Sequence, residues 1–272
     1  MLSSFHFVLF LHLMNLKITF LGTGTSQGIP VIGSDHPVCL SSNSKDKRLR
    51  SSLLIESSEG TSIVIDCGPD FRQQMLRNPI SKLDAILLTH EHADHTMGID
   101  DIRPFVFKQG GVNFFSSKET FNALKKRFNY IFNPEYQYPG IPKITSHIFD
   151  RDHSFQINEL EISTILASHG RSDVFGFKIG GLVYLTDVKE IKEDQLKYLI
   201  DSDILIINAL REEPHHSHLT LDEAVELSKA VNAKQTYFTH ISHHLGFHDD
   251  VQSDLEPNFY LAYDQLQLTY TY

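Results

Sequence analysis

Residues 87–95 read Leu87-Leu88-Thr89-His90-Glu91-His92-Ala93-Asp94-His95, so an apolar run gives way to three histidines and two carboxylates. Asp84 to Thr89 has the continuous apolar character of a strand buried on both faces. In layered α/β folds, ligand-binding residues gather at the carboxyl ends of such strands. If the chain stays extended to His92, the side chains of His90 and His92 project to the same side, because side chains alternate along a strand.

This cluster of histidines and carboxylates predicts a metal site. A turn after His92 would bring Asp94 and His95 toward a second ion. Imidazole nitrogens combined with carboxylate oxygens suit Zn, Mn or Fe, and a divalent ion held in this way polarises a substrate and lowers the pKa of bound water to about 7. The alternative is a polar loop with solvated histidines. The spacing His-x-His-x-Asp-His directly after a strand favours the metal site.

Length and composition predict one globular domain. The chain has 272 residues, of which 41% are hydrophobic, so it can bury a full core as one large domain or two small ones. No Gly/Ser or Pro tract, internal repeat or charge block resembling a linker occurs between Leu16 and Tyr272. We therefore expect a single domain over residues 15–272.

Charge and cysteine content narrow the function classes. The formal net charge of -10 argues against a general affinity for nucleic acid, which requires a surface rich in Lys and Arg. Local metal charge would still attract one anionic group, so a small anionic substrate is expected. The only cysteines, Cys39 and Cys67, exclude a disulfide framework and favour a reducing cytoplasm as the localisation.

Residues 1–14 precede the first predicted strand. Phe5 to Met14 is apolar but too short to span a bilayer, and no Lys or Arg precedes Lys17, so the charged start of a signal peptide is missing. We expect that residues 1–14 reflect a mis-assigned start and that Met14 opens the domain directly on its first strand. A membrane anchor is the alternative.

Further polar residues follow apolar runs along the chain. Strands are predicted at 16–21, 52–57, 62–66, 112–115, 160–166, 181–186, 203–208 and 235–239, and helices at 70–77 and 118–127 and after Thr220. His169, Asp187 and His240 each come at the end of one of these strands. Any one of them could be an ordinary polar strand end, but three in succession suggest one shared site.

The motif from His90 to His95 resembles the signature of the metallo-β-lactamase fold, and the resemblance extends over nearly the whole chain from Leu16 onward. It implies an α/β protein of the four-layer αβ/βα sandwich type, a fold that mostly hosts two-metal hydrolases. Because one fold serves many chemistries, the fold alone does not identify the substrate.

The same resemblance implies a ligand set for two divalent ions, zinc or manganese. One ion would be held by His90, His92 and His169, the other by Asp94, His95 and His240, and Asp187 would bridge them. Asp66 would support the histidine loop without binding metal.

Within this family the chain is most similar to the phosphoribosyl 1,2-cyclic phosphate phosphodiesterases. That branch carries a structural zinc loop with the pattern Cys-x-Cys-x-x-Cys, where this chain has Ser34, His36 and Cys39. Serine is a poor zinc ligand, so the resemblance implies at most a degenerate third site, formed by His36, Cys39 and His243. The alternative is a loop that folds without metal and leaves Cys39 as a free thiol.

Seven of the sixteen histidines fall between His215 and His248, more than two metal ions need. His218 precedes a helix that starts with the capping box Thr220-x-x-Glu223, and it resembles the active-site histidine of phosphodiesterase members. Catalysis is assigned to His218, as general acid or as a clamp on the phosphate, and to Asp94 among the ligands. His244 and His248 are expected at the surface.

Several stretches allow more than one interpretation. Arg48 and Arg50 fit either a solvated turn or a substrate phosphate site. Asp100 and Asp101 would either orient histidines or be solvated. The aromatic loop from Phe128 to Pro142 would cover the active site, stack on a nucleobase, form a homodimer contact or simply pack.

Taken together, the sequence predicts a metal-dependent hydrolase, specifically a phosphodiesterase for a small, cyclic phosphodiester. A tRNA 3'-end endonuclease is the nearest alternative, and the acidic charge and the lack of a long basic arm between Asp94 and His169 argue against it. A thioesterase or a lactamase is a further alternative, but the stretch from His215 to Thr220 favours phosphoryl chemistry. A metal-binding scaffold without catalysis is disfavoured by the complete set of ligands.

Overall fold

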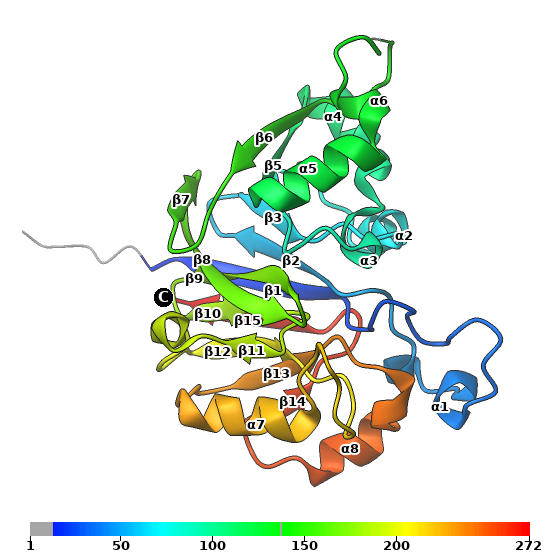
Figure 1. Cartoon of the computed structure of the whole chain (residues 1–272), viewed down its shortest axis with the longest axis vertical. Coiled ribbons are helices and arrows are strands. Elements are labelled where there is room, and N and C mark those ends of the chain that lie inside the picture. Colours follow the sequence, from blue (N-terminus) through cyan, green and yellow to red (C-terminus); the bar gives the residue numbers. More distant parts are fainter. Residues whose placement is uncertain (1–12, 137) are drawn as a thin grey trace, which may run out of the picture.

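The computed structural model describes residues 13–136 and 138–272. Two β-sheets pack face to face, and helices cover the outer face of each sheet (Figure 1). This arrangement is the four-layer αβ/βα sandwich that the sequence predicts, so the predicted fold class is confirmed. The expectation of a mis-assigned start concerns residues 1–14, of which residues 1–12 lie outside the described part. Met14 pairs through its backbone with Tyr272 at the start of the first sheet.

Seven strands form the first sheet in the order β15-β1-β2-β3-β4-β5-β6. In that order their bounds are Gln267–Thr271, Asn15–Gly22, Ser52–Ser57, Ser62–Ile65, Ala85–Leu87, Val112–Ser116 and Ile144–Ile148. The strands from β3 to β6 are parallel to one another. Their carboxyl ends therefore lie along one edge of the sheet, and the histidine cluster follows β4 at this edge.

Eight strands form the second sheet in the order β11-β8-β9-β10-β12-β13-β14, with β7 pairing to β8. Their bounds are Glu190–Ile191, Leu160–His169, Ser172–Ile179, Leu182–Tyr184, Ile204–Asn208, Thr236–Thr239 and Phe259–Leu261, and Ser154–Ile157 for β7. The strands from β10 through β12 and β13 to β14 are parallel. Asp187 and His240 follow β10 and β13 at their common carboxyl edge.

The helices are short. The α-helices are α1 Pro37–Leu40, α2 Phe71–Arg77, α3 Ala93–Thr96, α4 Arg103–Gln109, α5 Lys118–Arg127, α6 Asn129–Phe132, α7 Leu221–Ala230 and α8 His248–Asp254. In the described part of the chain, 3-10 helices lie at Ser44–Asp46, Ile99–Ile102, Glu193–Tyr198 and His243–Leu245. Within the described residues, none of these helices has the length and apolar character needed to cross a membrane.

Apolar side chains form one core between the sheets and one beneath each helical layer. Phe20 of the first sheet and Phe177 of the second belong to the central core. Ala224 of α7 packs on the outer face of the second sheet, and Leu124 of α5 packs on the outer face of the first. Each helix turns its apolar face toward a sheet because burial of that face supplies most of the stability of a short helix.

Where the sequence predicts a helix or strand, its boundaries agree with the structure to within a few residues. The capping box of α7 is confirmed, because Thr220 Oγ1 accepts from Glu223 N at 3.1 Å and Thr220 N donates to Glu223 Oε2 at 2.9 Å. Asp70 precedes α2 as predicted, but its side chain makes no capping bond. Its carboxylate instead accepts from Arg50 Nη1 at 3.0 Å.

Both readings of Arg48 are wrong. Its side chain is only 3% exposed, so it is neither solvated nor available to a substrate. Its Nη1 donates to Thr23 Oγ1 at 2.8 Å and to Ala262 O, and its Nη2 lies 3.1 Å from His248 Nδ1. His248 is 2% exposed, so the expectation of a surface histidine is also wrong. Arg50 is occupied by its ion pair with Asp70.

Asp100 does not orient a histidine. Its Oδ1 accepts from Arg103 Nη2 and from Tyr130 Oη, both at 2.6 Å. The aromatic loop is therefore anchored at its start to the 3-10 helix Ile99–Ile102. Farther along the loop, Tyr138 is 48% exposed.

Candidate metal centre

The chain after β4 places four polar side chains close together. His92 comes directly before α3, with φ -59° and ψ 154°, so the predicted turn after His92 is confirmed. Asp94 and His95 lie in the first turn of α3. The rings of His90 and His92 lie 4.5 Å apart, and those of His90 and His95 lie 4.4 Å apart, measured between centroids.

Three residues at strand ends adopt a left-handed backbone conformation. Asp66 after β3 has φ 63°, Asp187 after β10 has φ 59° and His240 after β13 has φ 55°. This conformation costs a non-glycine residue of order 1 kcal/mol, and such residues are concentrated at functional sites. The reversal of the chain turns each side chain inward between the two sheets, where all three are at most 2% exposed.

The predicted ligands come together in the structure. In the described residues, three groups have ligand atoms within 4.8 Å of one another: His90, His92 and His169; Asp94, His95, Asp187 and His240; and His169, Asp187 and His218. The first two groups contain all seven residues of the predicted set. His218, which the sequence assigns to catalysis, shares the third group with two of them.

Four of the histidines have their Nδ1 atoms occupied by other protein groups. His95 Nδ1 lies 2.7 Å from Asp66 Oδ2, and His90 Nδ1 lies 3.0 Å from Thr89 Oγ1, which itself donates to Asp66. His169 Nδ1 lies 2.9 Å from Ser217 O, and His240 Nδ1 lies 3.2 Å from Ser51 Oγ. Such contacts fix the ring orientation and leave Nε2 to face the cluster.

Two Nε2 atoms in the cluster, those of His90 and His95, lack a hydrogen-bond partner, whereas His240 Nε2 lies 3.1 Å from Thr25 Oγ1. His90 Nε2 is buried without a partner, and His95 Nε2 lies 3.1 Å from Asp94 Oδ2 and 3.2 Å from Asp187 Oδ2 without hydrogen-bond geometry to either. Buried polar groups normally have hydrogen-bond partners. Ring nitrogens that converge without such partners can offer their lone pairs to a bound cation. The chemistry of the donors, imidazole and carboxylate, suits zinc or a similar divalent metal.

The charges of the cluster also favour a cation. Burial lowers the pKa of His95, but the surrounding Asp187, Asp66 and Asp94 outweigh it and hold that pKa well above its usual range. Burial lowers the pKa of His240 to about 4. Three carboxylates around buried imidazoles therefore leave excess negative charge, which a divalent ion would neutralise.

His218 faces the cluster from the loop before α7. It is 9% exposed, and its Nε2 lies 3.1 Å from Asp187 Oδ1. Its ring stacks on that of His240 at 5.1 Å and meets that of His169 edge-on at 4.7 Å. On the other side, His218 Nδ1 lies 3.0 Å from His215 Nδ1, and burial lowers the pKa of His215 to about 4. The ring is therefore held between the cluster and a second imidazole.

A cavity of about 630 Å³ opens beside the cluster. His92 and His169 form one side of it, and His216 and Ser217 form another. Cavities of this size accommodate small-molecule ligands. Several supporting residues, Ser51, Thr89 and His215 among them, were not predicted, because a polar residue that orients a ligand has no spacing of its own in the sequence.

The expected third metal site is not brought together in the structure. The ring of His36 lies 4.9 Å from that of His243 between centroids, but the groups of ligand atoms within 4.8 Å in the described part of the chain do not include His36, Cys39 and His243. Cys39 Sγ accepts from Val31 N at 3.4 Å, and His36 Nδ1 accepts from Val38 N at 3.3 Å. The degenerate zinc site stays a prediction.

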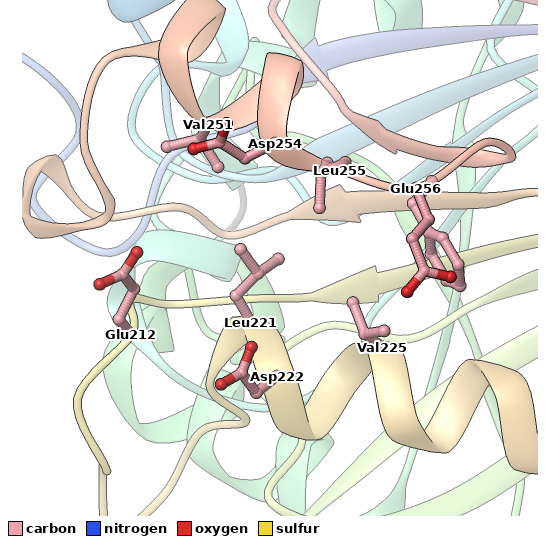
Figure 2. A pocket seen from close by; sticks show the side chains of 9 residues that line it. Glu212, Leu221, Asp222, Val225, Val251, Asp254, Leu255 and Glu256 are labelled. Atoms are coloured by element: carbon pink, nitrogen blue, oxygen red, sulfur yellow. The ribbon is translucent and has the colours of Figure 1, made fainter.

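A second hollow, of about 270 Å³, lies between α7 and α8 (Figure 2). Apolar side chains such as Leu221 and Val251 face one another across it, and carboxylates such as Glu212 and Asp254 lie at its rim. No histidine lines this hollow. The chemistry described above therefore belongs to the cavity beside His92 and His169.

Comparison with known proteins gives one domain family and several relatives. Residues 61–241 match the Beta-lactamase superfamily domain. An octanoyltransferase of Porphyromonas gingivalis is 36% identical over 93% of this chain, but the chain spans only 51% of the length of that protein. A ribonuclease Z of Bradyrhizobium diazoefficiens is 26% identical over 83% of this chain and 89% of its own length.

Solved structures give the same fold. A diphosphatase from the PhnP family is 38% identical, with a TM-score of 0.88, over 95% of this chain and 98% of that one. Zn²⁺-bound PqqB from Methylobacterium extorquens is 15% identical, with a TM-score of 0.76, over 93% of this chain and 99% of that one. At that identity the second likeness shows the fold alone.

Proposed function

This chain belongs to the β-lactamase superfamily and, within it, to the PhnP family, and from that premise we propose that it is a metal-dependent phosphodiesterase acting on a small phosphodiester. The observation that carries the proposal is the position of His218. It lies 3.1 Å from Asp187 and faces the two ligand groups without belonging to either. A hydrolase of this fold that cleaves a phosphodiester needs such a group to supply a proton to the leaving oxygen.

The groups of neighbouring ligand atoms support an assignment of residues to two metal ions. His90, His92 and His169 would hold one divalent ion, Asp94, His95 and His240 the other, and Asp187 would lie between them. Such ions, when bound, supply a water of lowered pKa and neutralise charge on the phosphate.

The remaining residues of the site would orient the ligand histidines and protonate the leaving group. Asp66 orients the rings of His95 directly and of His90 through Thr89, so the histidine loop keeps one arrangement. His218, held by His215 and Ser217, would donate its proton from Nε2 to the departing alkoxide. The cavity beside His92 and His169 gives a small substrate room to enter. A cyclic phosphodiester is the substrate we favour.

A second candidate is endonucleolytic processing of tRNA. The similarity to a ribonuclease Z over 83% of this chain supports it. Against it stands the net charge of -10, because a protein that binds a long RNA needs a basic surface. The segment between α3 and β8, where a long basic arm would have to emerge, instead holds helices, strands β5 and β6 of the first sheet, and β7, which pairs with β8.

A substrate panel separates these functions. Metal-loaded protein is assayed against cyclic phosphodiesters, bis(p-nitrophenyl) phosphate, a tRNA precursor, thioesters and β-lactams, with Asp94→Ala protein as the matched control. We expect hydrolysis of the small phosphodiesters, and its loss in the variant. Cleavage of the tRNA precursor alone would favour the second candidate, and activity confined to thioesters or lactams would contradict both.

A further inference from the structure

Arg127, the last residue of α5, contacts the loop that carries the histidine cluster. Its Nη1 donates to Glu91 O at 2.7 Å and to Thr96 Oγ1 at 2.8 Å. Thr96 Oγ1 in turn donates to His92 O at 2.8 Å. A hydroxyl donates one hydrogen bond and accepts others, so Thr96 can make both of its bonds at once. A helix on the outer face of the first sheet is thereby bonded to the loop on both sides of His92.

His92 depends on this contact more than the two other histidines of its group of ligand atoms do. The rings of His90 and His169 are each held through Nδ1 by another protein group, and both residues are buried. His92 is exposed, and in the part of the chain that the structure describes its ring contacts those two rings without making a hydrogen bond. The position of the His92 ring is therefore set by the backbone that Arg127 holds.

The second group of ligand atoms, which contains His95 and His240, has supports of its own. His95 Nδ1 lies 2.7 Å from Asp66 Oδ2, and His95 O accepts from Cys67 N at 2.9 Å. His240 follows β13 of the second sheet, away from the loop after β4. Loss of the Arg127 side chain should therefore disturb the first group more than the second.

The guanidinium of Arg127 is not engaged by a carboxylate. Arg50, Arg103 and Arg211 each have a carboxylate within ion-pair distance, whereas among the described residues Arg127 has none. A positive charge in the last turn of a helix is favourable in itself, but Lys126 supplies the same charge there. The planar guanidinium differs in holding its donors in fixed directions, which suits two acceptors at set positions. The hydrogen bonds to the loop thus distinguish Arg127 from its neighbour.

We propose that Arg127 is a positioning residue for the ion of the first group: it fixes the loop around His92 and thereby raises the affinity for that ion. The inference rests on the two-ion assignment made under the proposed function, and it does not depend on the substrate. Groups that orient metal ligands from outside typically contribute about 10- to 100-fold in metal affinity. The spacing along the chain gives no sign of this role, because Arg127 lies 36 residues from Glu91.

The test measures metal affinity rather than turnover. Chelator-treated protein is titrated with zinc in competition with a chromophoric chelator, which gives the affinities of two successive binding steps. The proteins His92→Ala and His240→Ala identify which step belongs to which group. The tested variants are Arg127→Met and Arg127→Lys. The matched control is Lys126→Met, because Lys126 is the neighbouring exposed cation of the same helix.

We expect Arg127→Met to weaken the step that is absent in His92→Ala by about 10- to 100-fold and to change the other step by less than about threefold. Arg127→Lys should lose less affinity, and Lys126→Met should behave like the parent protein. Thr96→Val removes the hydroxyl between Arg127 and His92 at similar volume, so it should weaken the same step. Its result decides the matter if Arg127→Met does not fold, as judged by circular dichroism.

Equal weakening of both steps, no weakening in Arg127→Met and Thr96→Val, or the same weakening in Lys126→Met would overturn the inference. Failure of the phosphodiesterase proposal is a separate result. A parent protein that binds two zinc ions but hydrolyses no phosphodiester would leave the test of Arg127 unaffected. A parent protein that binds fewer than two ions would overturn both the two-ion assignment and the inference.

Discussion

Asp187 belongs to two of the three groups of ligand atoms, more than any carboxylate around it. Its Oδ2 lies 3.2 Å from His95 Nε2, and its Oδ1 lies 3.2 Å from His240 Nε2. A carboxylate in this position would offset the repulsion between two ions held about 3.5 to 4 Å apart. The left-handed backbone that directs it inward is therefore part of the site.

We predict that the parent protein binds two divalent ions per chain and that Asp187→Ala binds at least one ion fewer, as measured by elemental analysis of the purified proteins. Asp173→Ala, an exposed aspartate of β9, should bind as much metal as the parent protein. Unchanged metal content in Asp187→Ala would exclude a bridging role.

A substitution of His218 tests whether this side chain acts in the chemical step or in metal binding. As general acid it would contribute about 10² to 10⁴ in rate without holding metal. His218→Ala should therefore keep the metal content of the parent protein and lose most of its turnover. The loss should be smaller for a nitrophenyl diester than for an alkyl diester, because nitrophenolate leaves with little protonation.

Two other results of that experiment have definite meanings. An equal loss of rate on good and poor leaving groups would indicate that His218 clamps the phosphate instead of donating a proton. A loss of metal would make His218 a ligand, which its place beside His169 and Asp187 also permits. Steady-state kinetics and elemental analysis on the same protein preparations separate the three cases.

At the scale of elements, the turn after β3 holds α3 in place. Cys67 N donates to His95 O at 2.9 Å, and Gly98 N donates to Cys67 O at 2.8 Å, so this turn is bonded to the short helix and to the residues that follow it. A four-residue helix has no intrinsic stability of its own. The orientation of Asp94 and His95 therefore depends on this backbone contact.

Gly68→Ala tests that dependence. An added Cβ would lie 1.9 Å from Asp94 O, so α3 would have to move away. We expect a loss of about 1 to 3 kcal/mol in the free energy of unfolding, together with a reduced metal content. Gly111→Ala, where the nearest atom would lie 3.3 Å from the added Cβ, should retain its metal. Full metal content in Gly68→Ala would show that α3 tolerates the displacement.

At the scale of the whole molecule, a buried network around Arg48 joins the two ends of the chain. Arg48 contacts Thr23 and Ala262, and His248 N at the start of α8 donates to Asp46 Oδ1 at 2.8 Å. Because Arg48 Nη2 has only donors to offer, His248 Nδ1 must accept from it, and the imidazole must be neutral. Burial, with Arg48 nearby, lowers the pKa of His248 to about 4.

This lowered pKa makes stability depend on pH. Between pH 6.5 and 4 the unfolded chain binds a proton at His248 that the folded chain does not, so the free energy of unfolding falls as the pH falls through this range. We expect His248→Gln to reduce the slope of stability against pH by about one proton. Urea unfolding at several pH values between 7 and 4 measures that slope.

The control is His153→Gln, because His153 is an exposed histidine directly before β7. This substitution should leave the slope of stability against pH unchanged. An unaltered slope in His248→Gln would mean that His248 is protonated in the folded protein. The same unfolding curves test the prediction of a single domain, because one domain should give one cooperative transition at each pH.

Features that arise from neighbouring residues could be predicted from the sequence. The continuous apolar run before Thr89 identified a buried strand, the spacing from His90 to His95 identified a cluster of candidate metal ligands, and Thr220 with Glu223 identified the start of α7. Each of these depends on side-chain periodicity or on hydrogen bonds across a few residues, so the information lies within one segment.

Contacts between distant segments could not be predicted from the sequence and are seen in the folded chain. His240 is oriented by Ser51, 189 residues away, and Arg48 is buried against Ala262, 214 residues away, so its charge is not available to a substrate. The same packing places Arg171 at the cavity beside His92 and His169. It leaves Cys39 outside the groups of candidate metal-ligand atoms. These contacts follow from how two sheets pack on each other, and no local spacing along the chain records that packing.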